Sequence, residues 1–333
     1  MYYNSLSDFY KKKFDTKVFK LSFNGGFTCP NRLNGNTGCI FCSGSYEFAG
    51  SVYKSLKEQY QEQIELIKNK GANAKYIAYF GSFTNTYDSV SNLKMRFETV
   101  LSFPNVVGLS IATRSDCITD ECLEYLKELN KRTYLTIELG LQSSYNETLK
   151  FINRGHDINN FIDCINKLKE NNISVVVHII NGLPNETEEM YLENIRFLNK
   201  FDIDGIKIHN LFIVKNTPLA EMYKKSPFKL LSKEEYIDIV CKQLRILKPE
   251  IVIHRLMSGP KKDDLIEPLW ALDRTNILNG IVKKLKKDKA YQGCDYTIFE
   301  KNTWHLYDFI VKYVGIRGKL YEKLWCNCIR KKS

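Results

Sequence analysis

The 333-residue sequence predicts an α/β protein built on a parallel sheet. Six short apolar runs typical of buried strands alternate with longer stretches in which apolar residues recur at helical spacing. Such alternation indicates βαβ units, in which crossover helices cover a parallel sheet. The length suits a single α/β barrel as well as two smaller domains, and a hydrophobic content of 44% provides for a large core.

The strands and helices can be placed along the chain from these patterns. The predicted strands are 18–23, 75–80, 106–112, 134–141, 173–180 and 205–214, followed by a seventh strand-like run at 251–256. The predicted helices lie at 55–70, around 93–101, at 119–129, in a broken stretch that ends at 170, and at 185–201. Thr119 is expected to cap its helix, and Asn185 and Glu188 have the spacing of a capping box.

Three cysteines stand in one glycine- and asparagine-rich loop after the first predicted strand. Cys29, Cys39 and Cys42 have the spacing C-x9-C-x2-C. Three thiolates on one flexible loop can converge on a metal centre and leave one position open, as an iron–sulfur cluster needs if it is to activate a ligand. A structural zinc site, which takes four protein ligands, and unligated thiols are the alternatives. The spacing favours the iron–sulfur site.

Polar residues follow the ends of most predicted strands. They are Gly81 with Ser82, Thr113 with Arg114, Gln142 with Ser143, Asn181 with Gly182, and His209 with Asn210. In barrels of parallel strands the carboxyl ends meet at one mouth, where the chemistry is located. We therefore expect these residues and the cysteine loop to form the rim of one active site.

Composition excludes several other classes. No run of 18 apolar residues is present, and the first residues lack the apolar stretch of a signal peptide, so we expect no membrane span and a cytoplasmic location. Ten cysteines in that compartment favour metal or redox chemistry over a disulfide framework. A Walker-type phosphate loop and the glycine-rich dinucleotide fingerprint are both absent from the sequence.

Positive charge is concentrated toward the C-terminal end. Residues 281–333 contain 13 Lys and Arg against 5 Asp and Glu, which is +8 of the formal charge of +11. Between 277 and 289 an apolar stripe lies opposite Lys283, Lys284, Lys286 and Lys287. A docked helix with this layout can present its lysines to phosphates, and the aromatic residues that follow it can stack unpaired bases. The alternative is the solvated lysine face of an ordinary surface helix.

The chain resembles the YhcC/YtqA-like family of radical S-adenosylmethionine (SAM) enzymes, which is similar to the radical SAM domain of the Elongator catalytic subunit. Several segments carry the resemblance: CPNR…GCIFC with Phe41 before the last cysteine, YFGSFTNT at 79–86, NRGH at 153–156, IINGLP at 179–184 and GIKIH at 205–209. It covers about residues 15 to 275. It implies a partial (β/α)6 radical SAM barrel over 1–215, with its cluster loop at 24–48, and a basic α-rich extension over 216–333 that completes the barrel mouth and contacts tRNA.

The resemblance implies two cofactors. A [4Fe–4S] cluster would be held by Cys29, Cys39 and Cys42, and its open iron would bind SAM, which members of the family cleave reductively to a 5′-deoxyadenosyl radical. The implied SAM contacts are Phe41, Gly81, Ser82, Phe83, Arg114, Glu138, Gln142, Asn181 and Gly182. Gly81-Ser82-Phe83 departs from the frequent Gly-Gly-Glu form, so Ser82 or backbone carbonyls would have to accept the ammonium hydrogens of SAM. Glu138 could instead be a buried, paired structural carboxylate.

Four further residues are candidates for catalysis. Lys207 and His209 share one face of a strand and are expected in the substrate pocket. Arg154 and His156 flank a glycine in a loop, where Arg154 could pair with a carboxylate of cofactor or substrate. A solvated surface arginine is the plainer interpretation of Arg154, and His178 fits a satisfied core histidine.

The remaining cysteines divide into two groups. Cys117, Cys122, Cys164 and Cys241 lie on helical patterns and fit small buried side chains. Cys326 and Cys328 could ligate an auxiliary cluster, although incidental thiols near the end of the chain are the simpler interpretation.

These expectations predict a radical SAM enzyme that acts on tRNA. Elongator-like relatives act at the wobble uridine, and the YtqA-like branch is associated with conversion of 5-carboxymethylaminomethyl(-2-thio)uridine there to the 5-aminomethyl form. The implied partners are tRNA, a flavodoxin- or ferredoxin-type reductant, and a downstream methyltransferase that acts on the product nucleoside. The alternatives are a radical SAM oxidoreductase acting on a small molecule or peptide, and a non-catalytic zinc-bearing nucleic-acid-binding protein.

Overall fold

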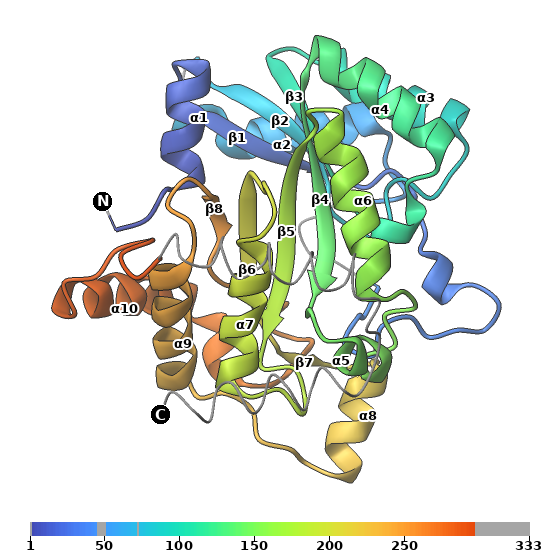
Figure 1. Cartoon of the computed structure of the whole chain (residues 1–333). Coiled ribbons are helices and arrows are strands. Elements are labelled where there is room, and N and C mark those ends of the chain that lie inside the picture. The colour runs from blue at the N-terminus through green and yellow to red at the C-terminus, as the bar shows by residue number, and fades with distance from the viewer. Residues whose placement is uncertain (1, 45–50, 72, 297–333) are drawn as a thin grey trace, which may run out of the picture. The chain divides into compact units, whose positions relative to one another are not determined.

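The computed structural model of the chain describes residues 2–44, 51–71 and 73–296 (Figure 1). The described residues up to Cys294 form one compact unit. Cys326 and Cys328, the predicted auxiliary ligands, lie outside the described residues, as does most of the basic tail. None of the helices in the described part of the chain combines the length and the apolar character needed to cross a membrane.

A seven-stranded parallel sheet forms the centre of this unit. Its order is β1 (Val18–Phe23), β2 (Lys75–Phe80), β3 (Val106–Thr113), β4 (Tyr134–Gln142), β5 (Ser174–Asn181), β6 (Gly205–Asn210) and β8 (Val252–Arg255). Each strand pairs in parallel with the strand that precedes it in this order, as in a barrel. The sheet curls, and the predicted partial barrel is confirmed. Its last strand comes from the segment after residue 215.

The sheet has helices on its outer face (Figure 1). They are α2 (Leu56–Ile67), α3 (Val90–Leu101), α4 (Asp120–Arg132), α6 (Ile158–Glu170), α7 (Glu188–Leu198) and α9 (Lys233–Ile246), and α10 (Arg274–Lys287) packs on α9. Two shorter helices, α5 (Asn146–Phe151) and α8 (Pro218–Lys225), lie beyond the carboxyl ends of the strands. Thr119 caps α4 as predicted, because its side chain accepts a hydrogen bond from the Cys122 amide.

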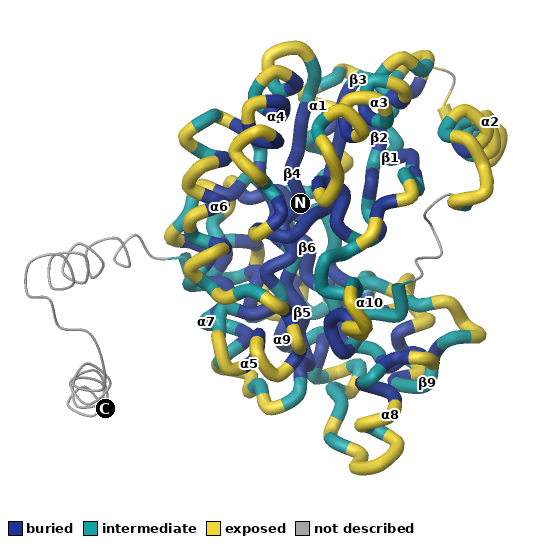
Figure 2. Tube along the Cα trace, turned by 90° about the vertical axis from the view of Figure 1, so that its right-hand side faces the viewer, coloured by how far each residue is buried: buried dark blue, intermediate teal, exposed yellow. Residues whose placement is uncertain are grey.

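The apolar core lies between the sheet and its helices. Alternate strand residues such as Leu21, Phe80 and Ile137 point outward and are almost fully buried, which gives the dark interior of the sheet in Figure 2. Phe97 of α3 is completely buried and its ring packs 5.2 Å from that of Phe80. Because side chains alternate across a strand, the other half of the strand residues faces the concave side of the sheet.

Helix α1 (Leu6–Phe14) closes the amino-terminal end of the curled sheet. It contacts both β1 and β8, and the Asn4 carbonyl just before it accepts a 2.7 Å hydrogen bond from the Ile253 amide. The rings of Tyr10 and Phe14 pack edge-on against Tyr134, the first residue of β4, with centroids 6.2 and 5.6 Å away. Aromatic side chains therefore block the amino-terminal end of the sheet, and access to its concave side is left to the carboxyl ends.

Two details differ from the sequence-based expectation. The predicted strand 205–214 is broken, because β6 ends at Asn210 and the next residues form β7 (Ile213–Val214), which pairs antiparallel with β9 (Leu265–Glu267) in a separate small sheet. The predicted capping box at Asn185 is wrong. Thr187 caps α7 instead, and Asn185 has a positive φ of 67° in the preceding turn.

Helix α10 confirms the predicted amphipathic helix near the basic tail. Ile277, Ile281 and Leu285 are fully buried where α10 packs on α9. Lys283, Lys286 and Lys287 are exposed on its other side. Lys284 is half-buried and pairs with Asp238 at 2.8 Å and with Asp288 at 3.4 Å, so its charge is already neutralised.

The burial of Phe97 leads to a prediction for stability. Phe97→Ala should lower the free energy of unfolding by about 3–5 kcal/mol, because it leaves a cavity among packed aromatic rings. Met95→Ala on the same helix is the matched control, because 60% of Met95 is exposed, and it should change stability by less than about 0.5 kcal/mol. Urea unfolding followed by circular dichroism measures both, and equal losses would contradict the assigned core.

Candidate active site

The cysteine loop is held by hydrogen bonds to the end of α5 and to α8, beyond the carboxyl ends of the strands. The Ile40 amide donates to the Ile152 carbonyl at 3.0 Å, and the Ile40 carbonyl accepts from the Leu219 amide at 2.9 Å. The Asn153 side chain donates to the Gly38 carbonyl at 2.8 Å. Ile40 itself is buried in a second apolar cluster beneath the loop. The segment at the end of α5 and the start of α8 therefore hold the loop that carries the three cysteines.

Arg154 lies directly beside the buried cysteine. Its Nη1 is 3.7 Å from Cys39 Sγ, and Asn31 Nδ2 lies at the same distance from that sulfur. Its Nη2 donates to the Gly140 carbonyl at 2.6 Å, and only 6% of the residue is exposed. A Cβ on Gly140 would come within 2.9 Å of this guanidinium, so the glycine makes room for the arginine. The solvated-loop interpretation of Arg154 is therefore wrong.

The surroundings of the cysteine loop suit an iron–sulfur cluster. Cys29, Cys39 and Cys42 lie on one loop, none of them forms a disulfide with a described residue, and Cys39 is buried. The N–H donors at Cys39 and the buried cation of Arg154 suit the negative charge of cluster thiolates. The donor set and its surroundings thus match the predicted [4Fe–4S] centre.

The turn after β2 has features of a ligand-binding backbone. Ser82 is 4% exposed, and its buried Oγ has no hydrogen-bond partner among the described residues. Phe83 adopts a positive φ of 61°, which is unfavourable for an aromatic side chain, and the following Thr84 amide donates to the Thr28 carbonyl beside the first cysteine. An unpaired buried hydroxyl is costly. The ammonium group of SAM, predicted to bind at Ser82, would supply the missing donor.

Two other predicted residues support the loops of the rim. The Arg114 guanidinium pairs with Asp116 at 2.6 Å and donates to the Arg154 carbonyl at 2.7 Å, so it fixes the segment that carries Arg154. The His156 ring lies 3.4 Å from Ser115 Oγ, and burial together with the charge of Arg154 lowers the pKa of His156 to about 4. The structure therefore places Arg154 beside Cys39, whereas His156 lies beside Ser115.

Gln142 and Phe41 complete the rim. Gln142 ends β4 with a positive φ of 73°, and its amide group lies over Gly140 beside Arg154. Phe41 is half-buried and packs on the apolar cluster beneath the loop. Both remain predicted SAM contacts.

The structure gives Asn181 a different role from the predicted SAM contact. Its side chain is fully buried and exchanges two hydrogen bonds with Gln243 of α9, at 2.7 and 2.9 Å, so both of its polar atoms are already used. Asn181 lies on the outer face of β5 because the side chains of that strand alternate. It positions the turn that follows, where Gly182 has a positive φ of 94°.

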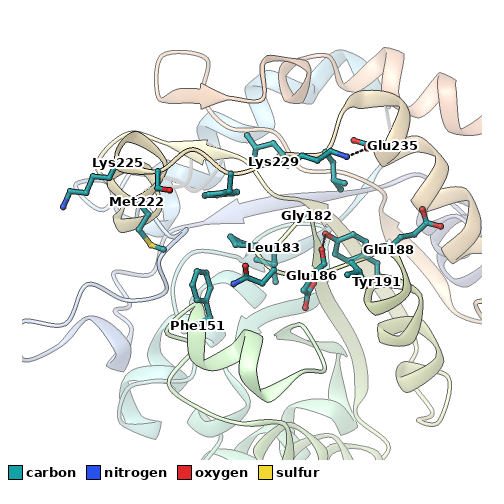
Figure 3. A pocket seen from close by; sticks show the side chains of 17 residues that line it. Phe151, Gly182, Leu183, Glu186, Glu188, Tyr191, Met222, Lys225, Lys229 and Glu235 are labelled. Atoms are coloured by element: carbon teal, nitrogen blue, oxygen red, sulfur yellow. Dashed lines mark hydrogen bonds and ion pairs between the residues drawn. The ribbon is translucent and has the colours of Figure 1, made fainter. Parts of the chain in front are cut away.

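A cavity of about 840 Å³ lies behind this turn (Figure 3). Gly182, Glu186 and Tyr191 line it on one side, and Met222 and Lys229 on the other. Burial raises the pKa of Glu186 to about 7. None of the three cysteines lines this cavity. It is therefore separate from the predicted cluster site.

The concave side of the sheet holds a buried charge network. We call the space lined by Lys20, Tyr79, Glu138, His178 and Lys207 the lumen. Glu138 at the middle of β4 is completely buried, and its carboxylate pairs with Lys20 at 2.6 Å and His178 at 2.8 Å, and also with Lys207. Ser110 Oγ donates to the same carboxylate at 2.7 Å. The predicted ribose contact of Glu138 would require these bonds to be exchanged, whereas the alternative of a paired carboxylate matches the geometry.

Burial and neighbouring charges shift the pKa values of the lumen. Burial alone would raise the pKa of Glu138, but Lys20, Lys207 and His178 lower it well below its usual range. Burial lowers the pKa of Lys207 to about 7, against the attraction of Glu138 and with the repulsion of Lys20 and Arg255. Burial and Lys207 lower the pKa of His178 to about 4 in spite of Glu138. At neutral pH the lumen therefore holds a carboxylate, cations and neutral histidines.

His209 occupies the lumen as the sequence predicts. Its ring centroid lies 5.3 Å from that of His178, and its buried Nε2 has no hydrogen-bond partner among the described residues. Burial and the positive charges nearby keep its pKa well below the usual range. A neutral imidazole with a free ring nitrogen can donate to or accept from a bound ligand.

Three lumen residues were not singled out from the sequence, namely Lys20, Tyr79 and Ser110, whereas Arg255, which closes the predicted seventh strand, was expected to approach the mouth. The pattern that could have revealed them is the alternation within β1, where Lys20 and Ser22 stand between apolar neighbours. Polar residues at every second position of an otherwise buried strand indicate a polar concave face.

Comparisons with known proteins agree with this arrangement. A sequence model described as the radical SAM superfamily matches residues 27–198, and one described as the radical SAM C-terminal domain matches residues 203–287. The protein YtqA of Bacillus subtilis is 42% identical over 295 residues, which are 87% of this chain and 92% of that protein. A tRNA uridine(34) acetyltransferase of Methanocaldococcus infernus is 34% identical over 179 residues, which are 49% of this chain and 32% of that protein.

A solved structure shows the same fold. Methanocaldococcus infernus Elp3 with an N-terminal deletion has a TM-score of 0.65 at 20% identity, over 83% of this chain and 64% of that one. At this identity the likeness concerns the fold alone.

The buried His178 makes stability depend on pH. Its pKa falls from 6.5 to about 4 on folding, so between these values the unfolded chain binds a proton that the folded chain does not. The free energy of unfolding should therefore fall by about 1–3 kcal/mol as the pH falls from 6.5 to 4. His178→Gln keeps a donor for Glu138 without titrating, and it should make this decline shallower in urea unfolding. An unchanged pH profile would contradict the assigned state of His178.

Proposed function

The chain belongs to the radical SAM superfamily and, within it, to the YhcC/YtqA-like branch, and from this premise we propose that it modifies the wobble uridine of tRNA. The proposed reaction converts the 5-carboxymethylaminomethyl(-2-thio)uridine side chain to the 5-aminomethyl form. Removing a hydrogen atom from the methylene next to the carboxylate would leave a carbon radical. Loss of one electron from this radical, to the oxidised cluster, and hydrolysis of the resulting imine by water would release the two-carbon unit as glyoxylate and leave the free amine.

Members of the superfamily use a [4Fe–4S] cluster and SAM, which supply a 5′-deoxyadenosyl radical that removes a hydrogen atom from the substrate. We assign Cys29, Cys39 and Cys42 as the cluster ligands. Arg154 would fix the orientation of Cys39 and offset the negative charge beside it. Ser82 would accept a hydrogen from the SAM ammonium group, and Phe41, Gly81, Phe83, Gln142 and Gly182 would shape the rest of that site.

The lumen residues would bind the substrate side chain and exchange protons with it. Aromatic residues of α1 and β4 block the amino-terminal end, so a base that enters at the mouth points its substituent toward Glu138 and Lys207. Lys207, with a pKa of about 7, can hold or release a proton near neutral pH. His209 offers an unpaired ring nitrogen beside it.

One observation carries the proposal: a cysteine loop lies beside a buried, charged lumen. The partial similarity of the chain to a protein named tRNA uridine(34) acetyltransferase supports the choice of tRNA. The exposed lysines of α10 support the choice of a polyanionic substrate. The same proposal includes two further partners. One is a reductant of the flavodoxin or ferredoxin type, and the other is a methyltransferase that consumes the product.

The first test measures 5′-deoxyadenosine formed by anaerobically reconstituted protein with SAM and dithionite, with and without bulk tRNA. We expect strong stimulation by tRNA and an aminomethyl nucleoside in the digested product. Cleavage that is indifferent to tRNA would favour a small-molecule or peptide substrate. One bound zinc and no iron or sulfide would instead favour the non-catalytic nucleic-acid-binding alternative.

Substitution of the cysteines tests the cluster ligands. Each of Cys29→Ala, Cys39→Ala and Cys42→Ala should lose most of the bound iron and sulfide and all 5′-deoxyadenosine formation, because three thiolates hold the cluster. Cys164→Ala is the control, since Cys164 lies on the buried face of α6 and burial raises the pKa of its thiol to about 12. Full iron content in any of the three loop variants would contradict the assignment.

The lysines of α10 are predicted to bind tRNA. Replacing Lys283, Lys286 and Lys287 together with Ala should raise the KM for tRNA by about tenfold or more at physiological salt and leave cleavage of SAM without tRNA unchanged. Replacing the exposed Lys11, Lys12 and Lys13 of α1, at the closed end of the sheet, removes the same charge and should have little effect. Equal effects of the two triple substitutions would contradict a specific role for α10.

A further inference from the structure

One cation of the lumen, Arg255, has no partner among the described residues. It ends β8, and in this part of the chain no hydrogen bond or ion pair joins its guanidinium to another residue. It is half-buried, and its positive charge lowers the pKa of Lys207, His178 and His209. Arg255 therefore faces the lumen and is close enough to act on three of its residues.

An irregularity in strand pairing turns Arg255 inward. In the pairing of β6 with β8, Ile206 is opposite Ile253, but Lys207 is opposite Arg255, so His254 is an extra residue in β8. The His254 ring occupies the space over Gly205, where a Cβ would lie 2.7 Å from it. Bulges of this kind redirect a side chain and are frequent next to active sites. Two successive residues of β8 thereby face the lumen.

The lumen carries more positive than negative charge. In the part of the chain that the structure describes, Lys20, Lys207 and Arg255 face it together with one carboxylate, Glu138. The histidines add no charge at neutral pH, because burial and these cations keep them neutral. Burying surplus charge of one sign is unfavourable unless a group of opposite charge joins it.

Several lumen side chains are partly exposed. The Lys20 side chain is 18% exposed and that of His178 is 14% exposed, although both lie on the concave side of the sheet. Tyr79, His209 and Arg255 are also partly exposed, whereas Lys207 is buried. Solvent therefore reaches Lys20 and Arg255.

We propose that Arg255, together with Lys20 and Lys207, binds a carboxylate group of the substrate inside the lumen. A guanidinium can bind both oxygens of a carboxylate at once, and the two lysines can add point charges. This inference rests on the proposed function for the identity of the substrate: the group would be the carboxylate of the carboxymethylaminomethyl side chain. Its methylene would then be held at a fixed depth below the mouth.

The test compares two anticodon stem-loop RNAs that carry 5-carboxymethylaminomethyluridine or its neutral carboxamide at the wobble position. Affinity is measured with the full-length, cluster-loaded protein and SAM in the absence of reductant, so that no turnover occurs. Wild type should bind the acid better than the amide, and Arg255→Gln should reduce this preference on the order of tenfold to a hundredfold. Arg255→Lys should retain part of the preference, because it keeps the charge.

Arg132→Gln on the outer surface of α4 is the matched control and should keep the full preference. Because Arg255 has no ion-pair partner among the described residues and adds to a surplus of positive charge, Arg255→Gln should not lower the melting temperature and should keep the wild-type affinity for SAM. Equal affinity of wild type for the two RNAs would overturn the inference, and so would an Arg255→Gln variant that keeps the preference or loses affinity for SAM.

Addition of reductant tests the proposed function separately. If wild type prefers the acid but converts neither RNA, the carboxylate site stands and the proposed reaction fails. If wild type converts the acid while Arg255→Gln keeps its preference, the reaction stands and the carboxylate site fails.

Discussion

The buried carboxylate of Glu138 is the constraint on which the curled sheet depends. It lies on β4, yet it pairs with Lys20 of β1, three strands away, and with Lys207 of β6, two strands away on the other side. In a flat sheet these side chains would be separated by the width of the intervening strands, about 5 Å each. The ion pairs can form only because the sheet is curled. Removing the carboxylate would leave two lysines facing each other without compensation, which is strongly unfavourable.

This network divides the protein into a stable outer layer and a reactive inner one. The outward residues of the strands pack with the helices into a continuous apolar core, which supplies most of the favourable free energy of folding. The concave side and its rim can therefore carry charges and polar atoms such as Ser82 Oγ and His209 Nε2, which have no hydrogen-bond partner in the described part of the chain. Each of these lowers stability by itself. Their concentration near the mouth of the sheet is typical of a site built for a ligand.

Local sequence predicted the strands, most helices and the rim of the mouth, because alternation, caps and strand ends are local properties. It predicted the buried helix face of α10 for the same reason. It could not predict that Asn181 forms hydrogen bonds with Gln243, which is 62 residues away in the sequence. Because of this pairing the Asn181 side chain points toward α9 and not toward the rim. The break after Asn210 was missed because the apolar residues continue into β7. The sequence placed Lys207 and His209 on one face, but which cations meet around Glu138 depends on the curvature of the whole sheet.

The charge balance of the lumen connects its electrostatics with recognition. Glu138 keeps its charge because several cations surround it, whereas burial, together with the repulsion of Lys20 and Arg255, lowers the pKa of Lys207 to about 7 in spite of Glu138. A second carboxylate in the lumen would raise the pKa of Lys207 again and keep that side chain protonated. A ligand with a negative charge therefore compensates the surplus positive charge of the lumen. A neutral ligand of the same shape leaves this charge uncompensated. Discrimination of this kind follows from unpaired buried charge and requires no additional contacts.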